Sequence, residues 1–153
     1  MVIPLRNQAT DGQDSRAPAP APLRYSATWD AETLRSVDAR RAVSAFLARL
    51  GYLPDQRVAQ DAQLVVSELV TNALRHAPGP CGLLLELSPG ADVLHITVWD
   101  TSPLLPELRP RDGSRIGGHG LRLVDMLCAD LRAGPLNGGK RVTADLRLPP
   151  LRA

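Results

Sequence analysis

Apolar residues recur at helical spacing in three parts of the chain, and each part predicts an amphipathic helix. The first helix is expected over about 31–50, because Asp30 is a suitable N-cap and Gly51 a suitable end. Its apolar stripe consists of Ala39, Val43, Phe46, Leu47 and Leu50. A second helix is expected over about 55–77 and a third over about 120–130. Each of these helices has one side suited to burial.

Four shorter stretches read as strands, at 23–29, 82–88, 93–100 and 140–148. The second is a continuous apolar run, whereas the others alternate between apolar and polar residues. Inward-facing positions of the last two strands are expected to be Leu94, Ile96, Val98, Val142, Ala144, Leu146 and Leu148. Alternation means that one face of the sheet is wet. The other face is available to the helices.

These elements predict an α/β two-layer sandwich with a mixed, largely antiparallel sheet covered on one face by about three helices. The domain is expected to span 23–150. Residues 1–22 are polar and run into "APAPAP", so they are expected to form a disordered tail. The segment 101–117 is rich in proline, glycine and arginine and predicts a long loop, a feature that is often functional.

Composition excludes several classes of protein. The 153 residues suit one domain, and 18 basic against 16 acidic residues are too balanced for a nucleic-acid binder. Two cysteines without a CxxC pair indicate neither a zinc site nor a disulfide framework. No signal peptide and no run long enough for a membrane span are recognisable, so a cytoplasmic protein without membrane contact is expected.

The second helix carries a polar ridge within the stretch "SELVTNALRHA". Residues four apart on a helix lie about 40° apart around its axis, so Glu68, Asn72 and His76 share one side, with Arg75 beside them. One interpretation is a solvated edge of an ordinary amphipathic helix. The other is a carboxylate and an amide directed into a cleft, where the amide oxygen suits Mg²⁺.

Two further features leave alternatives open. Asp100 has the parity of the buried positions of its strand, so either the strand has ended in a turn or the carboxylate has a dedicated partner. An amino group of a ligand, such as that of adenine, is one candidate. The run "GGHGL" at 117–121 opens the third helix, and it reads either as a plain loop or as a phosphate-binding helix start.

Taken in order, these motifs resemble the Bergerat-type (GHKL) ATP-binding fold of histidine kinases, type II topoisomerases, Hsp90 chaperones and anti-sigma-factor serine kinases. "ELVTNALRHA" resembles the N box, and "VWDTSP" and "GGHGLRLV" resemble the two glycine boxes. The resemblance covers roughly residues 25–148 and is closest to the short actinobacterial proteins similar to anti-sigma-factor serine/threonine kinases. In these, a glycine-lysine turn precedes the last strand, as in "GGKRV".

The resemblance implies ATP and Mg²⁺ as ligands and a role for each motif. Glu68 would be the general base or the carboxylate that orients the nucleophile, and Asn72 would hold Mg²⁺. Asp100 would bind the adenine amino group, and residues 102–117 would be the ATP lid. The full set of implied nucleotide-binding residues is Asn72, Arg75, His76, Asp100, Ser102, Gly118, His119, Gly120, Leu121 and Thr143.

The implied function is an ATP-dependent protein serine/threonine kinase that binds a sigma factor and phosphorylates a STAS-domain anti-sigma antagonist. The alternative is a nucleotide-gated protein-binding module with little or no kinase activity. A third interpretation, a scaffold that binds no nucleotide, is disfavoured by the intact motifs. The segment after Asp100 lacks the DxGxG glycines of histidine kinases, and no histidine precedes the domain as a phosphoacceptor. A homodimer is also implied, with the first strand and helix as candidate surfaces.

Overall fold

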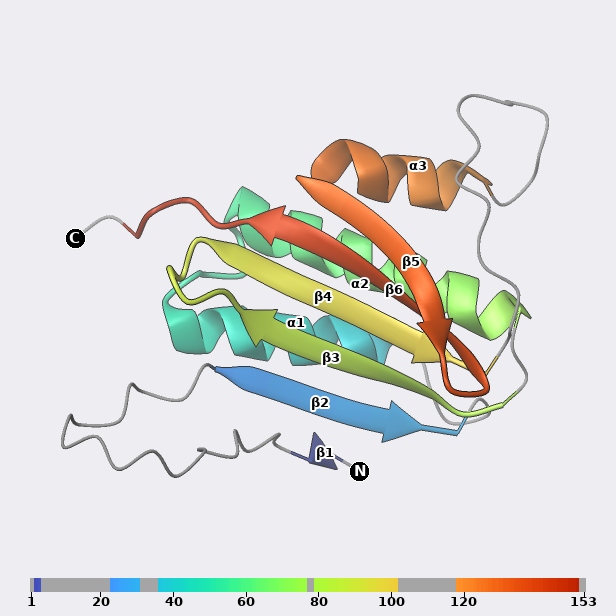
Figure 1. The fold of residues 1–153 in the computed structure, drawn as a ribbon. Coiled ribbons are helices and arrows are strands. Elements are labelled where there is room, and N and C mark those ends of the chain that lie inside the picture. Colours follow the sequence, from blue (N-terminus) through green and yellow to red (C-terminus); the bar gives the residue numbers. More distant parts are fainter. Residues whose placement is uncertain (1, 4–22, 31–35, 77–78, 102–117, 152–153) are drawn as a thin grey trace, which may run out of the picture.

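The computed structural model describes residues 2–3, 23–30, 36–76, 79–101 and 118–151 (Figure 1). Within these ranges the chain forms six strands and three helices. In chain order they are β1 (Val2–Ile3), β2 (Arg24–Trp29), α1 (Ser36–Leu50), α2 (Arg57–His76), β3 (Cys81–Leu87), β4 (Val93–Asp100), α3 (Gly118–Leu127), β5 (Asp130–Leu136) and β6 (Gly139–Arg147). None of these helices combines the length and the apolar character that a membrane span requires.

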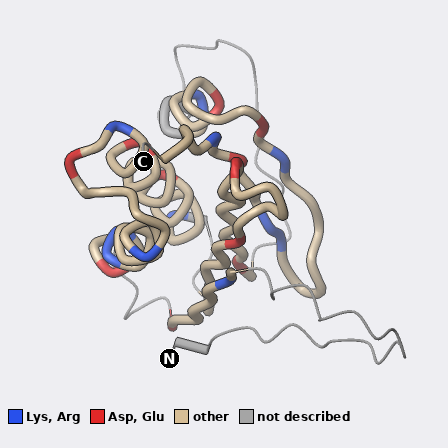
Figure 2. The backbone as a smooth tube through the Cα atoms, turned by 90° about the vertical axis from the view of Figure 1, so that its left-hand side faces the viewer, with Lys and Arg blue, Asp and Glu red and all other residues tan. Residues whose placement is uncertain are grey.

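The six strands form one sheet in the order β1-β2-β3-β4-β6-β5. Every pairing in this sheet is antiparallel. Helix α2 packs on β4 and β6, α1 packs on α2 and β3, and α3 packs on α2 and the β5–β6 pair. Figure 2 shows the helices on one side of the sheet, which is termed the covered face. The predicted two-layer α/β sandwich is therefore confirmed.

The core lies between the covered face and the helices. The predicted stripe of α1 is buried at four of its five positions, and Leu50 is partly buried. Leu94, Ile96 and Val98 of β4 are buried as their parity predicted. Opposite them on β6 stand Leu146, Ala144 and Val142, which are also buried. The alternation of these two central strands thus sets which side chains face the helices and which face the other side of the sheet, termed the open face.

The helix boundaries differ from the prediction by a few residues. Helix α2 begins at Arg57 and not at 55, because residues 54–56 form a turn. In that turn the Gln56 side chain accepts a hydrogen bond from the Leu53 N–H at 2.7 Å. Helix α3 ends at Leu127 because a strand begins three residues later. The expected cap at Asp30 concerns residues 31–35, which lie outside the described ranges.

Two strands were not predicted. Strand β5 has the sequence DLRAGPL and forms one edge of the sheet, pairing with β6 alone. Gly134 and Pro135 weaken its strand signal, and an edge strand tolerates proline because one side of its backbone needs no ladder partner. Strand β1 lies in the segment predicted to be a disordered tail, with Val2 opposite Ala27. Residues 4–22 lie outside the description, so the rest of that prediction is untested.

Candidate functional site

One end of the molecule gathers the elements that carry the predicted motifs. At the right-hand end of Figure 1 lie the last turns of α2, the end of β4, the start of α3 and the start of β6. Glu68 and Asn72 belong to the last turns of α2, Asp100 is the final residue of β4, and Gly118 is the first residue of α3. Antiparallel pairing of β4 with β6 and the packing of α2 and α3 over them produce this arrangement.

The polar ridge of α2 is half-buried. Glu68 and Asn72 are both intermediate in exposure, whereas Arg75 is exposed and Leu69 and Ala73 are buried against the sheet. Within the described ranges, no hydrogen bond or ion pair engages the side chain of Glu68 or Asn72. A carboxylate and an amide at the margin of a buried helix surface are thus available to a ligand. This half burial is inconsistent with a fully solvated edge.

Asp100 forms a buried ion pair with Lys140. The two residues stand directly opposite each other across β4 and β6, and Lys140 Nζ lies 3.4 Å from Asp100 Oδ2. Only 4 % of Asp100 and 2 % of Lys140 is exposed. Asp100 therefore ends its strand and also has a dedicated partner in the protein. Lys140 is absent from the predicted site residues, although it has the same parity as Val142 and its position on the covered face could have been inferred.

The surroundings of this ion pair are tight and apolar. Burial, and secondarily the negative charge of Asp100, raise the pKa of the Cys81 thiol to about 11. A Cβ atom at Gly139 would overlap the backbone carbonyl of Asp100, so only glycine allows this approach of β6. Gly138 adopts a φ of +76° in the preceding turn, a conformation that glycine adopts without a steric penalty. The "GGK" sequence thus sets Lys140 against Asp100.

The first turn of α3 supplies the third part of the site. The helix begins at Gly118, as the "GHGL" motif predicted, and Leu121 is buried in the core. Backbone N–H groups at a helix start have no partner within the helix, and they bind phosphate well. The predicted lid at 102–117, including Ser102, lies outside the described residues, as do the side chains of His76 and His119.

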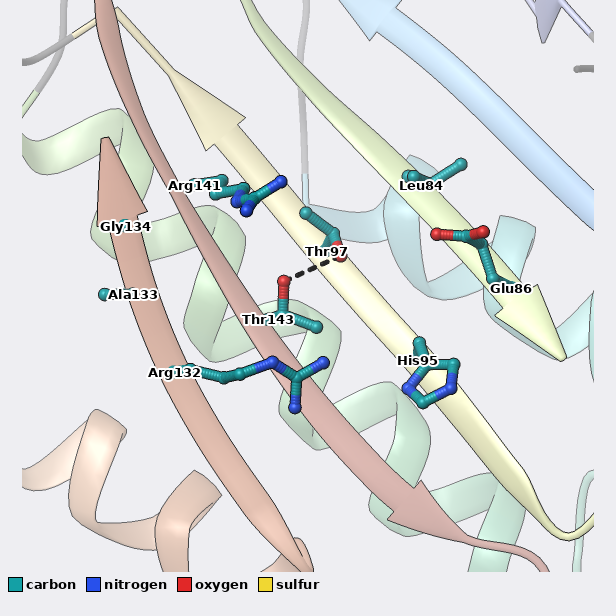
Figure 3. Close-up of a pocket in the computed structure, with 9 residues that line it drawn as sticks. All are labelled: Leu84, Glu86, His95, Thr97, Arg132, Ala133, Gly134, Arg141 and Thr143. Atoms are coloured by element: carbon teal, nitrogen blue, oxygen red, sulfur yellow. Dashed lines mark hydrogen bonds between the residues drawn. The ribbon is translucent and has the colours of Figure 1, made fainter. Parts of the chain in front are cut away.

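Thr143 lies on the other face of the sheet from Asp100 and Lys140. Its hydroxyl lies on the open face, 2.9 Å from the Thr97 hydroxyl (Figure 3). Asp100 and Lys140 lie on the covered face, with the parity of the buried Val98 and Val142. Arg141 and Asp145, the neighbours of Thr143 with the same parity, also face this way, so the sheet separates Thr143 from Asp100. Thr143 instead lines an open-face groove of about 340 Å³, formed by Leu84, Glu86, His95, Thr97, Arg132, Ala133, Gly134, Arg141 and Thr143.

A charged network borders this groove. Arg132 donates hydrogen bonds to both carboxylate oxygens of Asp145, at 2.6 and 3.2 Å, and His95 Nδ1 lies 2.6 Å from the same carboxylate. Burial would raise the pKa of Asp145, but the hydrogen bonds from Arg132 and His95 outweigh it and lower that pKa. Hydrogen bonds to Asp145 and Asp130 raise the pKa of Arg132. The network links β4, β6 and β5 on the open face.

Replacement of Asp145 by asparagine is expected to lower the free energy of unfolding at neutral pH by about 1–3 kcal/mol, the range for hydrogen bonds to charged groups. Because folding lowers the pKa of Asp145, its contribution is present above the unfolded value of about 3.9 and is lost as the pH falls below it. Urea unfolding at several pH values measures this. The exposed Asp130, which also bonds to Arg132, provides the control Asp130→Asn. If the difference in unfolding free energy between wild type and Asp145→Asn stays constant down to pH ~3, the ionised Asp145 carboxylate does not provide this stability.

The chain belongs to the histidine kinase-like ATPase domain family, whose model matches residues 28–145. This match covers every described element except β1, the first four residues of β2 and the last two residues of β6. The fold and the resemblance of the motifs to this class are thereby confirmed. No curated protein matches the sequence.

Among solved structures, the chain is similar to the crystal structure of the RsbU and RsbW domains of Rv1364c from Mycobacterium tuberculosis. The TM-score is 0.61 and the sequence identity 26 %. The similarity covers 90 % of this chain but only 35 % of the other, so this chain spans about a third of the length of the chain in that structure. An RsbW-containing structure therefore shares the fold of nearly the whole chain.

Proposed function

We propose that the protein is an ATP-dependent serine/threonine kinase of the anti-sigma type. The observation that supports this most directly is the meeting of three motifs at one end of the sheet. These are the half-buried Glu68 and Asn72, the buried Asp100, and the helix start at Gly118. A family defined as an ATPase domain implies ATP as the ligand. The three motifs supply the chemistry that ATP requires.

Each part of the site suits a different part of ATP. The Asp100 carboxylate is a buried hydrogen-bond acceptor, which suits the exocyclic amine of adenine. The amides at the start of α3 suit the phosphates, because the helix dipole favours negative charge at its N-terminus. Asp100 and Gly118 bound the lid segment on either side. The base and the phosphates would therefore bind at opposite ends of that segment.

The amide oxygen of Asn72 suits a Mg²⁺ ion that is also bound by the phosphates of ATP. No cluster of three or more His, Cys, Asp or Glu side chains suited to a metal occurs among the described residues. Mg²⁺ commonly keeps several waters and uses one or two protein oxygens together with the phosphates of a nucleotide. The amide oxygen of Asn72 would be such a ligand. When bound, Mg²⁺ would neutralise part of the phosphate charge.

Glu68 would orient the hydroxyl of the protein substrate and accept its proton. Phosphoryl transfer passes through a loose transition state, so positioning and charge neutralisation contribute most of the catalysis. A half-buried glutamate one helical turn before Asn72 is fixed by the backbone of α2 and faces the same side. The serine oxygen would attack the γ-phosphorus while the bond to the β-phosphate oxygen breaks, leaving ADP.

The proposed partners are a sigma factor and a STAS-domain antagonist that accepts the phosphate. Two observations support them, namely the motifs shared with anti-sigma-factor kinases and the fold shared with a structure containing an RsbW domain. A second candidate function is a nucleotide-gated binding module, which needs the same ATP pocket but transfers no phosphoryl group. Detection of phosphate on the STAS protein distinguishes the kinase from the binding module.

Saturation with Mg²⁺ and ATP is expected to raise the thermal midpoint. At about a hundred times the Kd, a ligand adds ~2.7 kcal/mol of stability. For a domain of this size, each kcal/mol corresponds to about 2–4 °C, so the expected shift is about 5–10 °C. Asp100→Asn should abolish most of the shift, because the amide can present a donor to the adenine amine. Differential scanning calorimetry measures the ATP-induced shift for the wild-type protein and for Asp100→Asn.

Thr143→Val is the matched control for this experiment. Thr143 was implied as a nucleotide contact by the resemblance, but it lies on the open face against Thr97. Its replacement should leave the ATP-induced shift intact. The proposed function fails if ATP leaves the midpoint of the wild-type protein unchanged at saturating Mg²⁺.

A further inference from the structure

The open-face groove has no part in the chemistry proposed for ATP, because it lies on the side of the sheet opposite the helices. Its volume of about 340 Å³ is within the range of ligand-binding pockets. Most of its charge is neutralised within the protein. Glu86 Oε2 lies 3.0 Å from Arg24 Nε, and both Arg132 and His95 contact the Asp145 carboxylate. These side chains satisfy one another and offer little to a further ion.

Arg141 is the lining arginine whose charge is not neutralised in this way. Its side chain is exposed and makes no hydrogen bond or ion pair with any residue in the described ranges. Figure 3 shows it on the same side of the sheet as the hydrogen-bonded Thr97 and Thr143. The residue opposite it on β5 is Gly134, and a Cβ there would have Arg141 Nε as its nearest neighbour, at 3.9 Å. The absent side chain leaves space beside the guanidinium for a ligand.

An indole ring lies next to Arg141 on the neighbouring strand. Trp99 is the residue opposite Arg141 across β4 and β6, and it has the open-face parity of Thr97. The ring lies over Gly82 of β3, because a Cβ at Gly82 would overlap the indole. Trp99 is partly exposed, and its N–H donates to no residue that the structure describes. A flat apolar surface and a set of available donors therefore adjoin on this face.

The chemistry of this pair indicates the group that would complement it. Arginine and tryptophan side chains donate hydrogen bonds and accept none, so the complementary group is an acceptor. A guanidinium binds a carboxylate through two parallel hydrogen bonds, and one unpaired positive charge matches one carboxylate. A phosphate group carries about two negative charges and would be repelled more strongly by the nearby Glu86. The favoured ligand group is therefore a carboxylate.

The indole favours a protein as the source of this carboxylate. An apolar side chain beside an aspartate or glutamate would cover the ring, and tryptophan and arginine are enriched among the residues that dominate protein–protein interfaces. A second copy of this chain fits less well. A twofold interface centred here would bring the Arg141 side chains of the two copies together, and like charges repel.

We propose that Trp99 and Arg141 form a docking site for an acidic segment of a protein partner. A carboxylate of the segment pairs with Arg141, and an adjacent apolar side chain packs on Trp99. The hydroxyls of Thr97 and Thr143 are available to the backbone of the segment, because a hydroxyl can both donate and accept. This site goes beyond the proposed function, since it requires no nucleotide.

Nuclear magnetic resonance of the indole N–H groups tests this proposal. The chain has two tryptophans, and the other one, Trp29, packs against the core. The blocked peptide acetyl-Leu-Glu-Leu-Glu-Leu-amide is titrated into the isotope-labelled protein without nucleotide, and Trp29→Phe assigns the two signals. The Trp99 signal is expected to shift with the peptide concentration, whereas the Trp29 signal should stay in place.

Three variants define the contribution of the charge. Arg141→Gln is expected to weaken peptide binding by about tenfold or more, because a hydrogen bond to a charged group is lost. Arg141→Lys keeps the charge without the two parallel bonds, so its Kd should lie between those of wild type and Arg141→Gln. Arg147→Gln removes an exposed cation six residues farther along β6. At roughly 20 Å this charge is screened, and the Kd should change by less than about twofold.

Two further ligands distinguish the possible occupants. The neutral peptide acetyl-Leu-Gln-Leu-Gln-Leu-amide should bind at least about tenfold more weakly than the acidic one. Glutarate has two carboxylates but no apolar side chain, and it should also bind more weakly. Binding of glutarate as tightly as the acidic peptide would make the groove a small-anion site and overturn the protein partner. A wild-type dimer that becomes a monomer in Arg141→Gln, measured by sedimentation, would assign the face to self-association instead.

The docking site itself is overturned by either of two results. One is an acidic peptide that leaves the Trp99 signal unmoved, and the other is equal affinity of this peptide for wild type and Arg141→Gln. Both results leave the proposed ATP chemistry untouched, because the titration contains no nucleotide. Conversely, a wild-type protein that binds the peptide but not ATP would remove the proposed function and keep this site.

Discussion

Replacement of Glu68 by glutamine is expected to slow phosphoryl transfer to a STAS-domain partner by about 10²- to 10⁴-fold, the range for loss of a general base. Glutamine has the same shape, so the helix and its packing should be preserved. Its amide cannot accept the proton of the attacking hydroxyl. Because Glu68 has no hydrogen bond or ion pair within the described part of the chain, the change leaves no buried partner unsatisfied.

The measurement is a single-turnover assay of phosphate transferred from ATP to the serine of the partner, with the ATP-induced thermal shift recorded in parallel. The shift should remain, since Glu68 is assigned to transfer and not to binding. Asp61→Asn makes the same type of change on the same helix, seven residues before Glu68 and farther from Asn72. It should leave the rate of phosphoryl transfer unchanged. Equal rates for wild type and Glu68→Gln would remove Glu68 from the mechanism.

Breaking the buried ion pair on one side is expected to destabilise the protein strongly. Lys140→Met leaves Asp100 without its cation, and loss of one member of a buried pair typically costs about 3–5 kcal/mol of unfolding free energy. Replacing both residues, as in Asp100→Leu with Lys140→Met, should recover most of this loss. The reason is that apolar side chains of similar volume do not carry the desolvation cost of two buried charges.

A double-mutant cycle by urea unfolding measures this coupling. Arg141→Met is the control, because it removes a cation from an exposed position of the same strand and should change stability by less than about 0.5 kcal/mol. Additive effects of the two single replacements would show that Asp100 and Lys140 do not interact energetically. In that case the 3.4 Å separation would reflect proximity alone.

The main elements of the fold follow from local patterns in the sequence. The strand Val93–Asp100 matched its prediction because alternation is unambiguous when one face is buried and the other is wet. Parity also singled out Asp100 as a buried carboxylate. Strand β5 escaped prediction because its glycine and proline are typical of turns, and only its pairing with β6 makes it a strand.

The site was less predictable than the fold because its contacts join strands that are distant in sequence. Lys140 looked like the end of a glycine turn, and its burial beside Asp100 depends on strand pairing rather than on any local pattern. Thr143 was assigned by resemblance, and strand parity alone would have placed it on the wet face beside Thr97. Motif likeness thus indicated the region of the proposed site, whereas strand register decides which side chains lie on the same face there.

The pairing of Asp100 with Lys140 has a consequence for how such chains can diverge. The 39 residues between them include α3 and the edge strand β5, and this stretch begins and ends at two residues that lie side by side. Doubling the length of a flexible loop costs only about 0.6 kcal/mol. Insertions and deletions between the elements of this stretch can therefore accumulate while Asp100 and Lys140 stay paired. Recognition of a new protein partner could evolve there without a change at this end of the sheet.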